Sequence, residues 1–348
     1  MNKKFLLWCL VLSGCAIHPL PEDFSGVDTQ DIVRQIRCET RYALIDMTAR
    51  YLEYGDNVDD ASRAIGRAFF TDKTKPLSSF SPKLFKGRVQ DSLNIFWKTG
   101  IAYNFKLNML ENNNFSAGVG FADPFVRGPT TGTVTMGLGG ALNRQRGNTR
   151  TFTVTDTIGR LISKIPDNFC ENKVVGPNYL YPITGEIGMK ELLKTFVYLS
   201  IFGGLMGTEK DLSKPPTMVD ALDFQTVIIG QVNPTQVVFS PIRNTFALVN
   251  ANINGEVRRT DIHQVTVGLA LDSAATTQLG PYRDFLFTRY GGSGPVGPMR
   301  SSATGVMGGS LFGRLLTASG TPAEIAAAEA VDQFLTQRLF SPTININP

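Results

Sequence analysis

The chain has 348 residues, of which 42% are hydrophobic and 18% are charged, so it is long enough to bury a sizeable core. The formal net charge is only +4. So weak a positive charge gives no electrostatic reason to expect a nucleic-acid partner. We therefore predict no role in nucleic-acid binding.

The first residues have the pattern of an export signal. Lys3 and Lys4 precede a short apolar run, residues 5–12, whereas a membrane span needs about 20 apolar residues. The run ends in Leu12-Ser13-Gly14-Cys15, which resembles the lipobox of bacterial lipoproteins. The resemblance implies a signal peptide over residues 1–14 and palmitate on Cys15. It also implies that the protein is attached to a membrane through that lipid anchor. An ordinary secretory signal with a chance cysteine is the alternative.

Residues 15–27 contain two prolines and no apolar period, which favours a flexible tether between the lipid and the first folded element. Ala16 follows the cysteine. In enterobacterial-type lipoproteins an Asp at that position retains the protein in the inner membrane. The resemblance therefore implies an anchor in the outer membrane, with the protein facing the periplasm.

Two further cysteines remain once the signal peptide is removed and Cys15 carries lipid, namely Cys38 and Cys170. Disulfides form and persist in the oxidising periplasm. We therefore predict a disulfide between Cys38 and Cys170. Two buried free thiols that pack as small apolar side chains are the alternative.

Three helices are expected before the first strands, over residues 28–54, 61–70 and 84–97, with Asp28 as the first N-cap and Gly55 as the first stop. An apolar stripe along the first helix comprises Ile32, Ile36, Ala43, Met47, Tyr51 and Tyr54. The arginines of this helix lie mostly off the stripe, so we interpret them as solvent-exposed: Arg34, Arg37, Arg41 and Arg50.

From Ile101 the apolar period changes to two, which indicates strands. We predict one hairpin from residues 101–109 and 115–121, joined by the Asn-rich residues 111–114, and a second that pairs 134–138 with 152–154. The tip of the second hairpin would carry three arginines: Arg144, Arg146 and Arg150. They could contact a partner protein or the phosphates of lipid headgroups and lipopolysaccharide, or simply be solvated.

The second half of the chain predicts a helix over 188–202 and then four strands, over 224–229, 235–239, 246–253 and 265–271, with Asn254-Gly255 as a hairpin turn. Residues 273–320 are rich in Gly, Ser and Pro, which indicates an irregular segment. Thr321 and Glu324 form a capping box that opens the last helix, and residues 321–348 are this helix and a tail.

These elements predict an α+β fold with antiparallel, sandwich-like sheets and with N-terminal, central and C-terminal helices. Residues 28–272 form the body, which could divide into two sub-domains near 205–222. The two groups of strands could belong to separate sheets or to one sandwich.

His263 is the only histidine outside the tether, and with Asp261 it could imitate part of a hydrolase triad. The sequence holds no nucleophile motif G-x-S-x-G, and a histidine bonded to Asp261 or to a backbone carbonyl is the structural alternative. One histidine and two paired cysteines do not suit a transition-metal site. We therefore predict no catalytic residue, no metal and no cofactor.

Apolar residues that alternate with Thr and Gly are typical of membrane-spanning strands and equally of a half-buried sheet. Four strands cannot enclose a pore alone, so the sequence favours the half-buried sheet. A pore would need several chains or the second group of strands.

Three short segments, Asp31–Glu39, Tyr181–Gly185 and Arg259–His263, resemble uncharacterised proteobacterial lipoproteins, which implies an envelope location and no mechanism. The leading hypothesis is a non-enzymatic, outer-membrane-anchored lipoprotein with a structural or partner-binding role. A subunit of an oligomeric outer-membrane channel or export complex is the first alternative. A periplasmic hydrolase is the second.

Overall fold

A computed structural model describes residues 19–127, 130–171, 176–207, 214–232, 237–238, 247–289 and 320–340. The expected signal peptide and Cys15 lie outside the described residues. The fold is α+β with an antiparallel sheet, as the sequence predicts. The chain divides into two compact units, and the first consists of residues 1–26, 107–150 and 224–263. The second unit holds the remaining residues. The chain therefore crosses between the two units several times and not once near residues 205–222.

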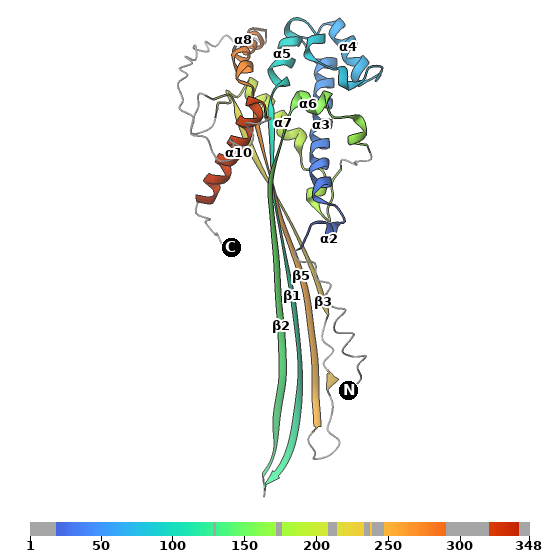
Figure 1. Ribbon diagram of the computed structural model, residues 1–348, viewed down its shortest axis with the longest axis vertical. Coiled ribbons are helices and arrows are strands. Elements are labelled where there is room, and N and C mark those ends of the chain that lie inside the picture. The colour runs from blue at the N-terminus through green and yellow to red at the C-terminus, as the bar shows by residue number, and fades with distance from the viewer. Residues whose placement is uncertain are drawn as a thin grey trace. The chain divides into compact units, whose positions relative to one another are not determined.

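The strands form one sheet (Figure 1). Its members are β1 (Gly100–Arg127), β2 (Thr130–Thr157), β3 (Thr217–Val232), β4 (Val237–Val238) and β5 (Ala247–Ala270). The order across the sheet is β2-β1-β5-β3, and β4 pairs antiparallel with β5. Because β5 lies between β1 and β3, both predicted strand groups belong to the same sheet. The sandwich-like arrangement expected from the sequence is therefore wrong for the described residues.

Three predicted turns lie inside strands. Residues 111–114 continue β1, residues 143–148 continue β2, and Asn254-Gly255 continues β5. Two predicted hairpins are thus one long hairpin, and Arg144, Arg146 and Arg150 lie within β2 instead of at a tip. Local turn propensity yields here to pairing with the neighbouring strand, a context effect typical of β-sheets.

Among its described residues, the second unit contains the five predicted helices and two that the sequence did not predict, α6 and α8. In chain order the helices are α3 (Thr29–Tyr54), α4 (Asp60–Phe70), α5 (Gly87–Trp97), α6 (Ile158–Ser163), α7 (Met189–Ile201), α8 (Ser273–Arg289) and α10 (Pro322–Phe340). Short turns of 3₁₀-helix cover Leu77–Ser79, Pro82–Leu84, Asp167–Phe169 and Pro182–Thr184. In the described part of the chain, no helix combines the length and the apolar character that a membrane crossing requires.

Helix α8 corrects one expectation, because it occupies the start of the segment 273–320 that we interpreted as irregular. Residues 290–319 lie outside the described residues. The last helix agrees with its capping box: the Thr321 backbone N–H donates to Glu324 Oε2 at 2.8 Å, and the Glu324 N–H donates to Thr321 Oγ1 at 3.3 Å.

Helix α3 organises the second unit. Ile32 and Ile36 are fully buried, whereas Tyr54 at the end of the predicted stripe is exposed. Cys38 and Cys170 form the predicted disulfide, with their Cα atoms 5.5 Å apart. The Glu39 carboxylate accepts hydrogen bonds from the backbone N–H groups of Ile187, Gly188 and Met189 at the start of α7. Burial raises the pKa of Glu39 in spite of these bonds.

Three of the four α3 arginines are structural, which contradicts the expected solvent-exposed surface. Arg37 pairs with Asp156 at 2.7 Å, and Arg41 donates to the Leu161 carbonyl at 3.0 Å. Arg34 donates to the Phe169 carbonyl. Only Arg50 behaves as expected, in an exposed pair with Asp46. These three arginines therefore bind α3 to the segment from Asp156 to Phe169, and helical periodicity alone does not predict such contacts.

Two glycines let α10 approach the sheet closely. A Cβ atom on Gly100 would lie 2.2 Å from the Ala323 carbonyl, and one on Gly268 would lie 2.6 Å from the Ala327 carbonyl. The contact is completed by a small apolar cluster of Ala102, Ala270, Ala327, Ala328 and Val331. Small residues on both elements thus allow backbone-to-backbone packing here.

Candidate functional site: the two faces of a β-ribbon

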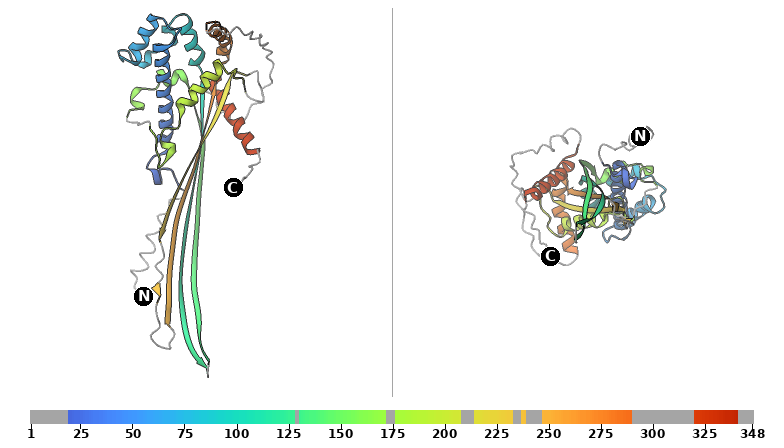
Figure 2. Two further views of the ribbon diagram at one scale, coloured as in Figure 1. Left: turned by 180° about the vertical axis from the view of Figure 1, so that it is seen from behind. Right: turned by 90° about the horizontal axis from the view of Figure 1, so that it is seen from below.

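The first unit consists mainly of strands, and we call its strand residues the ribbon: 107–127 of β1, 130–150 of β2, 224–232 of β3, β4, and 247–263 of β5. These strands lie side by side in Figure 1 and, from behind, in Figure 2. A ribbon of this kind presents two faces, because successive side chains of a strand point to opposite sides.

Cross-strand contacts fix which residues share a face. Glu111 of β1 pairs with Arg146 of β2 at 2.8 Å, and Thr149 donates to Asn108 at 3.4 Å in the same register. That register sets Phe115 opposite Leu142 and Val119 opposite Leu138. On the other side of β1, Gly118 and Gly120 lie against the side chains of Asn252 and Asn250. Odd positions of β1 and β5 therefore share one face with even positions of β2.

One face of the ribbon is apolar and exposed, and we call its apolar residues the apolar band. They are Phe115, Ala117, Val119, Phe121, Val134, Met136, Leu138, Leu142, Ala251, Ile253 and Val257. Leu138 is 68% exposed, and Met136, Ile253 and Val257 are each more than half exposed. Scattered apolar side chains are common on protein surfaces, but a contiguous group of this size marks an interaction surface.

The opposite face is polar or small along β1, β2 and β5. It carries Ser116, Gly118, Thr133, Thr135, Gly137, Gly139, Asn143, Gln145, Asn250, Asn252 and Asn254. Strand β3 departs from this pattern, because its exposed Val227 and Ile229 lie on that side together with Ile262 of β5. The ribbon is therefore amphipathic over its three longest strands, and it is mixed at the β3 edge.

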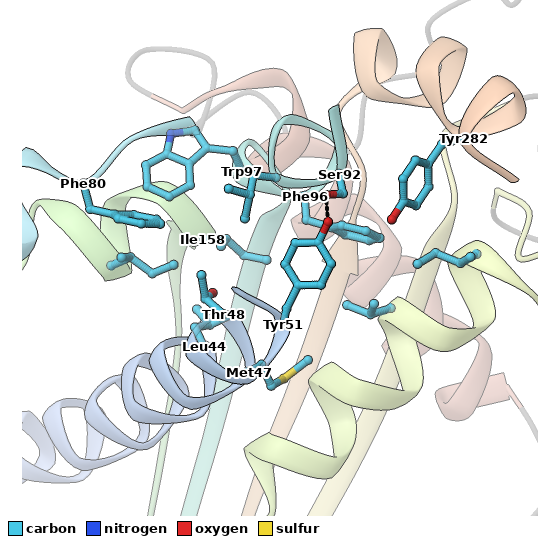
Figure 3. Close-up of a pocket in the computed structure, with 14 residues that line it drawn as sticks. Leu44, Met47, Thr48, Tyr51, Phe80, Ser92, Phe96, Trp97, Ile158 and Tyr282 are labelled. Atoms are coloured by element: carbon cyan, nitrogen blue, oxygen red, sulfur yellow. Dashed lines mark hydrogen bonds between the residues drawn. The ribbon is translucent and has the colours of Figure 1, made fainter. Parts of the chain in front are cut away.

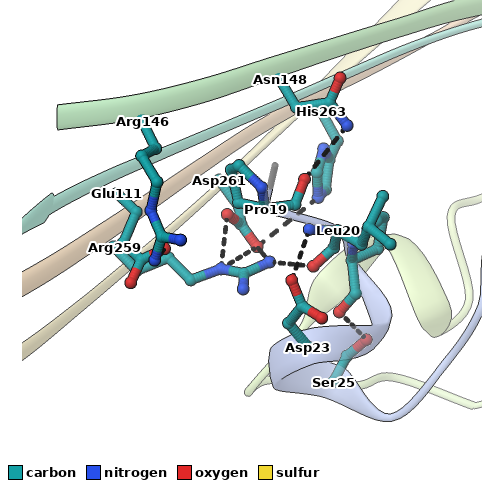
Figure 4. A network of polar contacts seen from close by, with 11 residues as sticks. Pro19, Leu20, Asp23, Ser25, Glu111, Arg146, Asn148, Arg259, Asp261 and His263 are labelled. Atoms are coloured by element: carbon teal, nitrogen blue, oxygen red, sulfur yellow. Dashed lines mark hydrogen bonds and ion pairs between the residues drawn. The ribbon is translucent and has the colours of Figure 1, made fainter. Parts of the chain in front are cut away.

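Charged side chains end the apolar band on the apolar face. Arg144 and Arg146 follow Leu142 at alternate positions of β2, and Arg259 follows Val257 in β5. We call these charged residues the polar border. In it, Arg146 pairs with Glu111, and Arg259 pairs with Asp261 at 3.0 Å (Figure 4). The three arginines of the sequence prediction are thus part of a strand, and Arg146 is bound to Glu111.

The N-terminal residues 19–26 are held at the same polar border. Asn148 donates to the Pro19 carbonyl at 3.1 Å, and Arg259 donates to the Leu20 carbonyl at 2.6 Å (Figure 4). A short helix, α2 (Glu22–Ser25), follows, and Asp23 accepts from the Leu20 N–H at 2.7 Å. The expected flexible tether is therefore ordered from residue 19 onward.

His263 lies in β5 beside this network, with Nε2 4.0 Å from Asp261 Oδ2. Its side chain is 2% exposed, and burial lowers the pKa of His263 to about 4. A neutral, buried imidazole cannot meet a substrate, so the geometry supports the structural interpretation of the Asp261–His263 pair over the hydrolase interpretation.

The second unit contains a cavity of about 190 Å³ that is lined almost entirely by apolar side chains. Tyr51, Phe80, Phe96, Trp97 and Tyr282 form much of its wall (Figure 3). Tyr51 and Ser92 share a hydrogen bond of 2.5 Å there, and burial raises the pKa of Tyr51. The described residues place no group of three or more metal-ligating side chains together, in this cavity or elsewhere.

A family model described as "Uncharacterised protein y4kA" matches residues 18–278, so the chain belongs to this family. The match begins at the tether and ends within α8, and thus includes the whole ribbon. One relative is the uncharacterized protein y4kA of Sinorhizobium fredii, which is 29% identical over 265 residues, or 75% of this chain and 80% of that protein. These names carry no activity.

Two solved assemblies contain chains with a distant likeness. One is an ETEC pilotin–secretin AspS–GspD complex, at a TM-score of 0.22 and 10% identity, over 67% of this chain and 63% of that chain. The other is the Klebsiella pneumoniae type II secretion system outer membrane complex, at 0.18 and 12%, over 71% and 51%. The chain thus spans less than two thirds of either. TM-scores this low do not relate the folds.

Proposed function

We propose that the protein is an outer-membrane lipoprotein whose ribbon enters the bilayer as one subunit of an oligomeric channel. The observation that carries the proposal is the apolar band. On β2 the band extends over nine residues, Val134–Leu142, or roughly 30 Å of strand. Membrane-spanning strands have about 9–11 residues and alternate between apolar and polar positions.

The exposure of the band favours a membrane over a half-buried sheet. Each large apolar side chain that stays in water forgoes about 1.5–3 kcal/mol of burial. Phe115, Val134 and Leu142 are half exposed, and Leu138 is more so. Hydrocarbon would cover this face at once, whereas an aqueous location would leave all of these side chains solvated.

The polar border supports one orientation. Arg144 and Arg146 end the band on β2, where their guanidinium groups would meet the phosphates of lipid headgroups. Cys15 precedes Pro19 by four residues, which reach at most about 14 Å when extended. Because Pro19 is bound at the border by Asn148, an acylated Cys15 would insert its lipid beside the ribbon, in the periplasmic leaflet.

The polar face supplies the channel. Thr133, Thr135 and Asn252 would line water once the apolar face contacts lipid. Four strands are too few to enclose an aqueous pore, since known membrane pores of this architecture use many more. Several copies of the chain would therefore contribute their ribbons to one closed sheet.

Flotation with liposomes tests the proposal. The Cys15→Ser protein, produced without residues 1–14, has neither the acylation site nor the apolar signal segment, so its flotation reports the ribbon itself. We expect this protein to float with vesicles and the variant that adds Met136→Asp and Leu138→Asp to remain in the dense fraction, because each carboxylate on the lipid face costs about 2 kcal/mol or more.

Thr135→Asp with Gly137→Asp is the matched control, since it places the same charges between those positions on the polar face. This variant should still float, and in planar bilayers it should shift the channel towards cations. Failure of the Cys15→Ser protein to float, or equal flotation of both aspartate pairs, would contradict entry of the ribbon into the bilayer. Vesicles that bind protein without conducting would contradict the channel.

A further inference from the structure

The sheet has two open edges at opposite ends of its strand order. Strand β2 is one edge, and β3 with β4 is the other, because β3 and β4 both pair with β5. Among the described residues of the ribbon, the outward backbone groups of these strands therefore have no strand beside them. Open edges are the natural place for another strand to add.

Within the ribbon, residues 130–143 of β2 and 224–232 of β3 carry none of the features that usually prevent such pairing, although β4 on the second edge is a strand of only two residues. Soluble proteins protect edges with prolines, lysines or short strands. The 28 residues of β2 and the 16 residues of β3 contain no proline and no lysine. In a bilayer the edges cannot stay open, because hydrocarbon offers no hydrogen bonds to backbone N–H and C=O groups.

The two edges are complementary in direction. The sheet is antiparallel, so β2 and β5 run one way and β1 and β3 run the other. A β2 edge placed beside the β3 edge of another copy continues the antiparallel alternation. The apolar faces of the two edges also match, since Gln264 of β5 donates to Asp223 of β3, which leaves Phe224 and Ile228 on the face of the apolar band.

We propose that the β2 edge of one copy pairs with the β3–β4 edge of the next, head to tail, so that a second copy of this chain is the partner of each edge. The proposal rests on the proposed function, which requires that several copies share one closed sheet. Head-to-tail contacts close into a ring when the rotation between copies permits it.

Pairing of like edges is the alternative, and the polar border argues against it. Two β2 edges can pair antiparallel only if one copy is reversed relative to the other. The arginines of the border, Arg144 and Arg146, would then lie at opposite ends of the joined apolar band. Head-to-tail pairing keeps every border, and every N-terminal segment held there, on one side of the membrane.

Cysteine cross-linking of the full chain in native membranes tests the interface. Gln231→Cys on β3 is combined in turn with a cysteine at each odd-numbered position of β2 from Gly137 to Thr149, all on the polar face. After mild oxidation we expect one or two adjacent β2 positions to give a ladder of dimers, trimers and larger species on non-reducing gels. When the two corresponding single-cysteine variants are mixed in the same membranes, oxidation should give dimers and no larger species.

The matched control is Ser116→Cys with Asn254→Cys, which face each other across β1 and β5 within one copy. This pair should cross-link inside the monomer and give no ladder. Dimers from a single β2 cysteine, or no ladder at any position, would overturn head-to-tail pairing. Flotation of the same variants in the Cys15→Ser background separates the two proposals: variants that float there but give no ladder in native membranes contradict this interface alone, whereas loss of flotation of the Cys15→Ser protein itself contradicts the proposed function.

Discussion

Strand β1 has one apolar pattern and two environments. Ile101, Phe105 and Met109 are fully buried, whereas Phe115 and Val119, farther along the same face, are exposed. The alternation of apolar residues is the same in both stretches, so period two specifies which side of a strand is apolar and not what covers it. Whether the cover is protein or lipid has to be read from the surroundings.

The two units also differ in what stabilises them. The second unit is held by long-range side-chain contacts, namely the Cys38–Cys170 disulfide, the Arg37–Asp156 pair and the Glu39 cap of α7. The apolar band of the first unit makes the ribbon's surface instead of a core. We therefore expect substitutions in the second unit to change the free energy of unfolding, and substitutions in the band to change membrane binding.

The disulfide should give the largest effect on stability. Cys38→Ala with Cys170→Ala removes a link between residues 132 positions apart, and the chain-entropy model assigns about 4–5 kcal/mol to a loop of this length. Thermal unfolding of the Cys15→Ser protein with and without the two substitutions measures the loss. Leu138→Asp, on the apolar band, should leave the melting temperature nearly unchanged. A similar loss in both variants would contradict the division of roles.

Loss of the Arg37–Asp156 pair should give the second-largest effect on stability. Asp156 is fully buried, and burial raises the pKa of its carboxyl while the Arg37 guanidinium lowers it. Arg37→Ala leaves the Asp156 carboxylate without its cation, which costs roughly 3 kcal/mol. Arg50→Ala is the control, since Arg50 pairs with Asp46 at the exposed surface and should cost at most a few tenths. Equal losses in chemical denaturation would show that Arg37 is as dispensable as Arg50.

These contrasts show what the sequence could and could not predict. Helical periodicity and capping residues are local, so α3 and the Thr321–Glu324 capping box were predictable. The faces of the ribbon were predictable too, because alternation sets Met136 and Thr135 on opposite sides. Strand lengths were not, since the Asn-rich residues 111–114 have turn chemistry that only cross-strand pairing overrides. The polar border was missed because Arg259 and Leu20 are distant in the chain.

The pH dependence of stability tests whether His263 is buried at the end of the ribbon. Its pKa falls from 6.5 in a free side chain to about 4 because burial disfavours the imidazolium. Below pH 6.5 the unfolded chain therefore binds a proton that the folded chain refuses, and stability decreases as the pH falls towards 4. The full contribution is roughly 3 kcal/mol. Chemical denaturation at pH 7.5 and 4.5 should show that the free energy of unfolding falls less for His263→Gln than for the parent protein.

His18→Gln is the control for that comparison, because His18 is the only other histidine of the chain. It should retain the parent's pH dependence. If His263→Gln loses as much stability as the parent between these pH values, the imidazole is not buried in solution and the hydrolase interpretation regains its main requirement.

Arg146 should give the smallest effect on stability and the one most specific to the ribbon. Arg146 and Glu111 are both partly solvated, at 32% and 21% exposed, so Arg146→Ala should cost less than about 1 kcal/mol. Its effect should appear in the membrane instead. At the polar border the guanidinium would meet lipid phosphates, so flotation of the Cys15→Ser protein with vesicles that contain anionic lipid should weaken in Arg146→Ala and lose part of its salt dependence. Arg146→Lys keeps the charge and should restore both. An unchanged salt dependence in Arg146→Ala would place the border away from the headgroups, even if the apolar band itself enters the bilayer.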